Sequence, residues 1–151
     1  MECWNWQLLA HTTDDKIKIY KDCEFEMGNN IAVLMTCFNR KDKTLKSLES
    51  LFRQNADVDV YLVNDGCTDG THEAVTLQFP QVNIIRGTGS LFWNRGMHLA
   101  WTTAVGRRDY DHFLWLNDDT MLYPDAIQEL MKCSESEHQK CSGEEMKNVE
   151  F

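Results

Sequence analysis

The sequence has few basic residues and no long apolar run. Its 151 residues include 15 Lys and Arg against 24 Asp and Glu, which gives a net charge of −9 at pH 7. A chain this acidic repels a phosphate backbone, which argues against nucleic acid as a partner. No stretch approaches the roughly 20 consecutive apolar residues that a membrane-spanning helix needs. We therefore expect no transmembrane segment.

The sequence also lacks a paired-cysteine motif and a secretory signal. None of its six cysteines forms a CxxC pair, and the first residues lack the basic and apolar regions of a signal peptide. Reduced cysteines in a cytoplasmic protein are the simplest interpretation. The chain does contain 42% hydrophobic and 11% aromatic residues, which are values typical of one globular domain.

Four apolar runs of strand length alternate with four patterns of helical length. Runs that are apolar on both faces suit parallel strands covered by helices. The alternation predicts an α/β fold with a parallel sheet and helices on both of its faces. The expected strands are residues 31–37, 58–63, 82–85 and 112–116, and the expected helices are residues 43–54, 71–79, 93–105 and 124–133.

Two flanking segments and one aromatic residue complete the expected organisation. Residues 1–30 show no clear period, and we interpret them as an amino-terminal extension of a folded part that spans residues 31–133. Residues 134–151 are polar and are expected to form a disordered tail. Trp101 lies on the apolar side of the third helical pattern, and we expect it to pack in the core.

An acidic motif follows the fourth expected strand. Ligands of parallel sheets bind beyond the carboxyl ends of the strands, and Asn117, Asp118 and Asp119 stand at such an end. Neighbouring carboxylates repel each other, so a hard divalent cation held there would relieve that repulsion and could bridge to phosphates. The alternative is a polar turn in which Asp119 or Thr120 caps the next helix.

A second polar motif, residues 64–71, follows the second expected strand. Asp65 could accept hydrogen bonds from a nucleobase or a ribose, and the glycines of the motif allow tight turns. A calcium loop is excluded, because Cys67 stands at the loop's third position, which is a ligand position, and Thr76 stands where the loop needs its closing glutamate. The alternative is an Asx-turn that leads into the next helix.

A third motif, residues 86–96, is rich in glycine and precedes the third expected helix. It differs from a dinucleotide-binding fingerprint because Phe92 stands at the third glycine position. A glycine-rich turn into a helix can still direct backbone N–H groups at an anion. Arg95 could add positive charge there. Trp93 could form one wall of a site for a sugar or base, and the alternative is that it packs in the core.

Taken together, these segments resemble the donor-binding half of a family 2 glycosyltransferase of the GT-A fold. Four motifs occur in the family's order over roughly residues 31–131. The resemblance implies a Rossmann-like parallel sheet that ends before the acceptor-binding half. The matching motifs are residues 36–40 (TCFNR), 64–71 (NDGCTDGT), 89–97 (GSLFWNRGM) and 116–119 (LNDD).

The resemblance also implies a role for each matching position. The loop that wraps the donor nucleotide matches Thr36, Phe38, Asn39 and Arg40, and the acid that contacts the base matches Asp65. With the charge of Arg95 and the carboxylate of Asp118, these residues make up the expected nucleotide site.

The DxD region of the family matches Asn117, Asp118 and Asp119, with Asp119 as the main ligand of Mn²⁺ or Mg²⁺. The metal would stabilise the departing diphosphate. The implied donor is a nucleotide-diphospho-sugar of the UDP, dTDP or GDP type. The parent reaction would be an inverting transfer to a glycan or lipid-linked acceptor in polysaccharide biosynthesis. The implied location is cytoplasmic and peripheral at the inner face of the membrane.

The chain departs from the family pattern in two ways. Asn117 is a weaker metal ligand than a carboxylate, so we expect Asp118 to share the metal. No segment matches the acceptor half, which supplies the general base in the family, so whether this chain is an enzyme stays open. The alternatives are a non-catalytic nucleotide-binding domain and a structural domain whose acids only cap helices. Without the acceptor half, an apolar patch beside an unpaired sheet edge favours a homodimer or a poorly soluble monomer.

Overall fold

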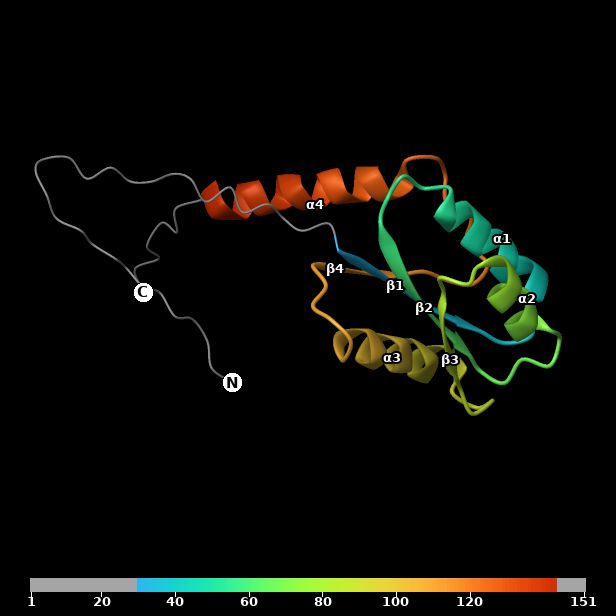
Figure 1. Ribbon diagram of the computed structural model, residues 1–151. Coiled ribbons are helices and arrows are strands. Elements are labelled where there is room, and N and C mark those ends of the chain that lie inside the picture. The colour runs from blue at the N-terminus through green and yellow to red at the C-terminus, as the bar shows by residue number, and fades with distance from the viewer. Residues whose placement is uncertain (1–29, 144–151) are drawn as a thin grey trace, which may run out of the picture.

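The computed structural model describes residues 30–143 of the chain, and it shows the expected alternation of four strands and four helices (Figure 1). The strands coincide with the apolar runs to within one residue at each end. The elements are β1 (Ile31–Cys37), α1 (Lys41–Phe52), β2 (Val58–Asn64), α2 (Thr71–Gln78), β3 (Asn83–Arg86), α3 (Phe92–Val105), β4 (His112–Trp115) and α4 (Ala126–Gly143).

The four strands form one parallel sheet in the order β3-β2-β1-β4. β1 lies between β2 and β4, with Ile31 opposite Val58 on one side and His112 on the other. The two longest and most apolar strands, β1 and β2, are therefore the central ones. Because the strands are parallel, their carboxyl ends meet at one edge of the sheet.

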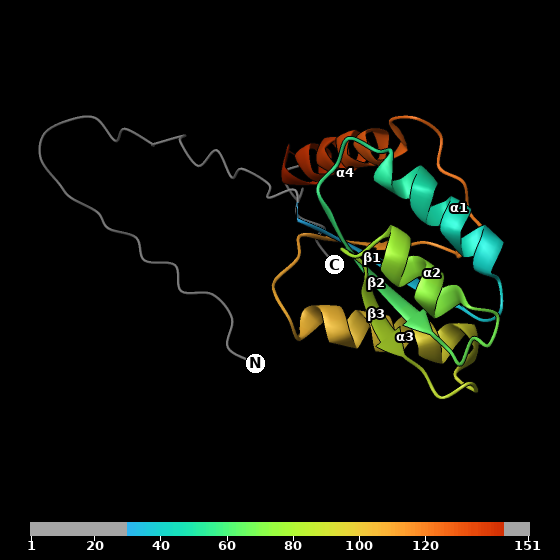
Figure 2. The same ribbon diagram turned by 45° about the vertical axis from the view of Figure 1, so that its right-hand side comes forward.

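Helices cover both faces of the sheet, as predicted. α3 lies on one side, and α1, α2 and α4 lie on the other (Figure 2). Alternate residues of β1 enter the two cores, since successive side chains of a strand point to opposite faces. Val33 and Met35 pack with Leu48 and Val75, whereas Leu34 packs with Met97.

The fourth helix differs from the expected one at both ends. It begins at Ala126 rather than Pro124, because Asp125 adopts a φ of 62° in the left-handed region. It continues to Gly143, so the expectation of a disordered tail is wrong for residues 134–143. Residues 134–142 contain no Pro or Gly, and Glu, Gln and Lys favour a helix. Residues 1–29 and 144–151 lie outside the described residues.

Trp101 does not pack in the core, which corrects the expectation from the helical pattern. Its side chain is 42% exposed, whereas Ala100 and Ala104 are fully buried. α3 approaches the sheet closely: a Cβ on Gly96 would collide with the side chain of Thr36. Small residues therefore face the sheet, and the bulky indole is turned outward. Within residues 30–143, no helix is long and apolar enough to cross a membrane.

Candidate functional site

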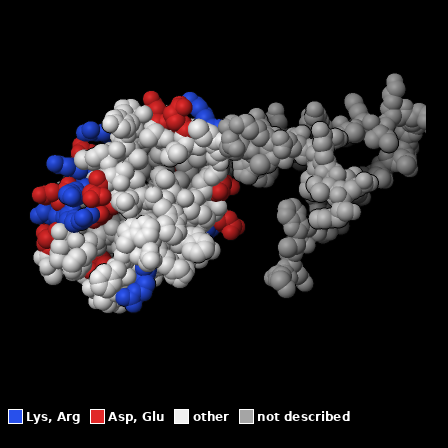
Figure 3. Space-filling model, turned by 180° about the vertical axis from the view of Figure 1, so that it is seen from behind, with Lys and Arg blue, Asp and Glu red and all other residues white. Residues whose placement is uncertain are grey.

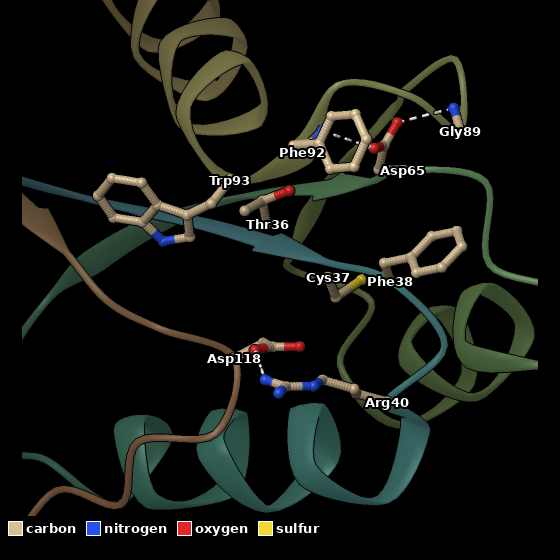
Figure 4. Close-up of a pocket in the computed structure, with 9 residues that line it drawn as sticks. All are labelled: Thr36, Cys37, Phe38, Arg40, Asp65, Gly89, Phe92, Trp93 and Asp118. Carbon is tan, nitrogen blue, oxygen red and sulfur yellow. Dashed lines mark hydrogen bonds and ion pairs between the residues drawn. The ribbon is translucent and has the colours of Figure 1, made fainter.

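A cavity of about 310 Å³ lies at the carboxyl edge of the sheet (Figure 4). It is bounded by the ends of β1 and β2, by the segment after β4 and by the loop that enters α3. The sequence motifs that follow separate strands therefore meet around one space. The residues that line it are Thr36, Cys37, Phe38, Arg40, Asp65, Gly89, Phe92, Trp93 and Asp118.

Asp65 organises the loop that enters α3. Its carboxylate accepts hydrogen bonds from the backbone N–H groups of Gly89 (2.7 Å), Leu91 (2.8 Å) and Phe92 (3.2 Å). A Cβ on Gly87 would stand 2.9 Å from the Cα of Asp65, so only glycine permits this close approach. A carboxylate has about four acceptor positions, and three are occupied here. The count leaves one acceptor position, on Oδ1, for a further donor.

Arg40 lies between the two aspartates that follow β4. Its Nη1 is 3.1 Å from Oδ1 of Asp118 and 3.1 Å from Oδ2 of Asp119. Lys43 lies 3.7 Å from the same oxygen of Asp119. The hydrogen bond and charge of Asp118, followed by the charge of Asp119, raise the pKa of Arg40. Burial raises the pKa of Asp118, although the Arg40 guanidinium opposes that shift.

The chemistry of these oxygens fits a divalent cation at Asp118 and Asp119. Both carboxylates reach one and the same nitrogen atom of Arg40, so they can also converge on one metal ion. Asn117 is engaged elsewhere, because its Oδ1 accepts a hydrogen bond from the indole N–H of Trp93 at 3.0 Å. No group of three or more His, Cys, Asp or Glu side chains gathers within the described range, so a ligand would have to complete the coordination shell.

The loop after β1 brings the first motif to the cavity. Thr36 and Phe38 line it directly, and the ring of Phe38 is 55% exposed. Asn39 does not line it; this residue adopts a φ of 52°, and its side-chain oxygen accepts the N–H of Thr68 at 2.7 Å. Asn39 therefore ties the first motif to the second.

Arg95, like Asn39, Asn117 and Asp119, is a predicted site residue that does not line the cavity. Its guanidinium donates to the carbonyl oxygens of Ser90 and Leu91, within its own loop. Four lining residues were not among the predicted site residues: Cys37, Gly89, Phe92 and Trp93, of which Trp93 was considered only as a candidate wall for a sugar or base. Phe92 adopts a φ of 55°, a conformation that favours glycine. Its place at the glycine position of the fingerprint was the signal that could have singled it out.

The parallel sheet and the cavity at its carboxyl edge define a GT-A type of α/β domain. The chain belongs to glycosyl transferase family 2, whose family model matches residues 32–141. It is 31% identical over 109 residues to a hyaluronan synthase of Streptococcus pyogenes. That match covers 68% of this chain and 26% of the synthase, so the chain spans about a quarter of the length of this relative.

Solved structures of the same fold include two with bound nucleotide sugars. S. aureus TarS 1-349 in complex with UDP-GlcNAc has a TM-score of 0.61 at 17% identity, over 72% of this chain and 32% of that one. The mannosyltransferase PcManGT from Pyrobaculum calidifontis, in complex with GDP-Man and Mn²⁺, has a TM-score of 0.55 at 20% identity, over 68% of this chain and 31% of that one. These likenesses support the GT-A fold.

Proposed function

We propose that this chain binds a nucleotide-diphospho-sugar together with Mn²⁺ or Mg²⁺, as the donor-binding part of a glycosyltransferase. The observation that carries the proposal is that Asp65, Arg40 and Asp118, which follow three different strands, line one cavity of about 310 Å³. Structures of the same fold that hold UDP-GlcNAc or GDP-Man with Mn²⁺ support it.

The nucleoside occupies the side of the cavity formed by Thr36, Phe38 and Asp65. The exposed ring of Phe38 offers a flat apolar surface to a base. The remaining acceptor position of Asp65 suits an N–H of the base. Asn39 does not contact the nucleoside in this arrangement. Its hydrogen bond with Thr68 instead holds the loop after β1 against the loop after β2.

The diphosphate lies against Arg40, Asp118 and Asp119. A guanidinium matches the geometry of phosphate oxygens and keeps its charge. Asp118 and Asp119 would hold the metal, which when bound supplies charge neutralisation for the leaving diphosphate. Asn117, whose oxygen is held by Trp93, orients that indole at the cavity wall. Arg95 would reach the phosphates only after it releases the carbonyl oxygens of its own loop.

The parent reaction that we infer is an inverting transfer to a glycan or lipid-linked acceptor. It needs a general base, yet among residues 30–143 the carboxylates that line the cavity are those of Asp65 and Asp118 alone. Asp65 is bonded to three N–H groups and Asp118 to Arg40. This observation favours a second candidate function, nucleotide-sugar binding without catalysis by residues 1–151 alone.

Calorimetry with UDP tests the binding proposal. We expect UDP to bind at least about tenfold more tightly with Mn²⁺ than with EDTA, a difference of about 1.4 kcal/mol. Asp119→Ala should remove that difference and leave binding in EDTA unchanged. Asp109→Ala, which alters an exposed aspartate near the amino end of β4, serves as the matched control. Equal Mn²⁺-dependent binding by wild type and Asp119→Ala would refute the metal assignment.

Turnover separates the two candidate functions. General-base catalysis typically contributes about 10²–10⁴-fold, so we expect the purified chain to bind donor but to show only slow donor hydrolysis. The assay compares release of UDP from a UDP-sugar with and without added glycan acceptors. Fast release that depends on an acceptor would show that the chain supplies its own general base and would eliminate the non-catalytic alternative.

A further inference from the structure

Two thiols meet behind the proposed nucleotide site. Cys37 ends β1 and Cys67 follows β2, and their sulfur atoms are 3.8 Å apart. Cys37 lines the cavity and is 2% exposed, whereas Cys67 is partly exposed. The backbone fixes this approach on both sides. The N–H of Asp65 donates to the carbonyl oxygen of Cys37 at 3.0 Å, and the N–H of Cys67 donates to the side chain of Asn64 at 2.8 Å.

The sulfur atom of Cys67 and the backbone beside it contact two loops that surround the cavity. The backbone N–H of Asn39 donates to Sγ of Cys67 at 3.2 Å. Gly66, next to Cys67, lies so close to Gly89 that a Cβ on it would be 2.8 Å from the Cα of Gly89. A movement of Cys67 is therefore transmitted both to the loop after β1 and to the loop that enters α3.

We propose that Cys37 and Cys67 form a reversible disulfide site, and that closing the disulfide weakens nucleotide binding. The oxidant is hydrogen peroxide or another small hydroperoxide. A disulfide needs the sulfur atoms about 2.05 Å apart, so the loop of Cys67 must move toward the end of β1. That movement changes the contact with Asn39 and shifts Gly66 against Gly89. The consequence for the nucleotide rests on the proposed function, but the thiol chemistry does not.

The chemistry proceeds in two balanced steps. Cys67, the more exposed thiol, attacks one oxygen of the peroxide as its thiolate; the O–O bond breaks, hydroxide leaves, and a sulfenic acid forms. The sulfur of Cys37 then attacks the sulfur of Cys67, and the S–O bond breaks. The departing hydroxide takes the proton of Cys37 and leaves as water. Overall, two thiols and one hydrogen peroxide give one disulfide and two waters.

Burial and the neighbouring Cys67 raise the pKa of the Cys37 thiol far above its usual range. Cys37 is therefore a poor first nucleophile. Its position, 3.8 Å from the other sulfur, instead suits the second, intramolecular step. A dithiol reductant reverses the reaction by thiol–disulfide exchange.

The test uses the full chain with Cys3, Cys23, Cys133 and Cys141 replaced by serine, so that only the two thiols of interest remain. Circular dichroism confirms that this background folds. After treatment with hydrogen peroxide, we expect the loss of both thiols, the loss of two hydrogens in mass, and a cross-linked peptide that contains Cys37 and Cys67. Dithiothreitol should restore both thiols. UDP with Mn²⁺ should bind at least about tenfold more weakly to the oxidised form.

Cys67→Ser in the same background is the matched variant, because its hydroxyl can still accept the N–H of Asn39. Its affinity for UDP should equal that of the reduced two-cysteine protein. Peroxide treatment should cause no change in its UDP affinity that dithiothreitol reverses. Oxidation of the two cysteines to separate sulfinic acids, or a cross-link that leaves UDP affinity within about twofold, would overturn the proposal. Failure of the reduced chain to bind UDP would instead refute the proposed function, while the mass measurement would still decide the thiol chemistry.

Discussion

Arg40 is held by Asp118: its Nη1 lies 3.1 Å from Oδ1 of that aspartate, and the same nitrogen lies 3.1 Å from Asp119. The guanidinium thus occupies the position between the two carboxylates that we propose for a divalent cation. An incoming metal must displace it, and an incoming diphosphate would offer it new partners. Figure 4 shows Arg40 and Asp118 side by side at the edge of the cavity.

Replacement of Arg40 should therefore change the affinities for Mn²⁺ and for UDP in opposite directions. In Arg40→Gln, Mn²⁺ alone should bind about 3- to 10-fold more tightly, because no cation competes for Asp118 and Asp119. UDP in the presence of Mn²⁺ should bind about tenfold more weakly, because the diphosphate loses a charged partner. Calorimetry of each ligand, alone and together, measures the coupling between them.

Lys46→Gln is the control for the loss of one positive charge, since Lys46 is exposed on the same helix. It should leave both affinities within about twofold. If Arg40→Gln weakened Mn²⁺ binding in the absence of nucleotide, the guanidinium would not be a competitor of the metal.

Asp65 should matter for stability as well as for nucleotide binding. The residue is 4% exposed and accepts three backbone N–H groups. Asp65→Ala removes the acceptor of these three part-buried hydrogen bonds, and a hydrogen bond to a charged group contributes about 1.5–3 kcal/mol. We expect urea unfolding to show a loss of about 2–4 kcal/mol in the free energy of unfolding. Amide exchange at Gly89 and Leu91 should also accelerate.

Asp57→Ala, at an exposed position before β2, should change the free energy of unfolding by less than about 0.5 kcal/mol. Unchanged exchange at Gly89 in Asp65→Ala would show that the loop before α3 does not depend on this carboxylate.

The strands could be predicted from the sequence because a strand that is buried on both faces has a continuous run of apolar residues. A continuous apolar run of 7 residues such as 31–37 is too short for most helices and therefore favours a buried strand between turns. The place of the cavity could be predicted by the same argument, since polar motifs after parallel strands meet at one edge of the sheet.

The contacts within the site could not be predicted, because they join residues far apart in the chain. Asp65 bonds to N–H groups 24 to 27 positions away, and Arg40 bonds to Asp118 across 78 positions. The prediction that Trp101 packs in the core was wrong, because periodicity cannot distinguish the sheet-facing Ala100 from its bulky neighbour Trp101. The close approach of α3 to the sheet leaves room there only for the smaller side chain. The extent of α4 was missed because polar residues were read as disorder although they favour a helix.

Asp69 should give the fold a pH-dependent stability. Its carboxylate accepts the hydroxyl and the N–H of Thr71 at the start of α2 and the N–H of Lys41 at the start of α1. These bonds, with the Thr71 hydroxyl as the largest contribution, lower the pKa of Asp69 below its ordinary value of 3.8. A lowered pKa means that the stabilisation is present above the ordinary value and is lost as the pH falls through the lower, folded-state value.

We therefore expect Asp69→Ala to reduce the free energy of unfolding by about 0.5–2 kcal/mol at pH 7, the range for loss of a helix cap. The difference from wild type should shrink as the pH falls below about 4. Urea unfolding at several pH values measures it, with Asp57→Ala as a control that shows no such trend. A difference that stayed constant down to pH 2.5 would show that the ionised carboxylate is not the stabilising group.

The open edge of the sheet should pair two copies of the chain. β4 pairs with β1 alone, so the backbone groups on its other side have no strand partner in the described part of the chain. Large apolar side chains are exposed on β4 and on α3: Phe113 (36%), Trp115 (50%), Trp93 (49%) and Trp101 (42%). Seen from behind, the middle of the molecule carries few charged side chains (Figure 3). Exposed apolar surface beside an unpaired strand favours self-association.

Phe113→Lys should weaken the dimer, because a charge on an edge strand opposes edge-to-edge pairing. Light scattering after size-exclusion chromatography should show a dimer for wild type at micromolar concentration and a monomer for the variant. The dissociation constant should rise at least about tenfold. Leu77→Lys places the same charge at an 84% exposed position on α2 and should leave the dimer intact. A monomeric wild type, or equal dissociation by both variants, would exclude β4 as the interface, and the exposed aromatic residues would then need another partner.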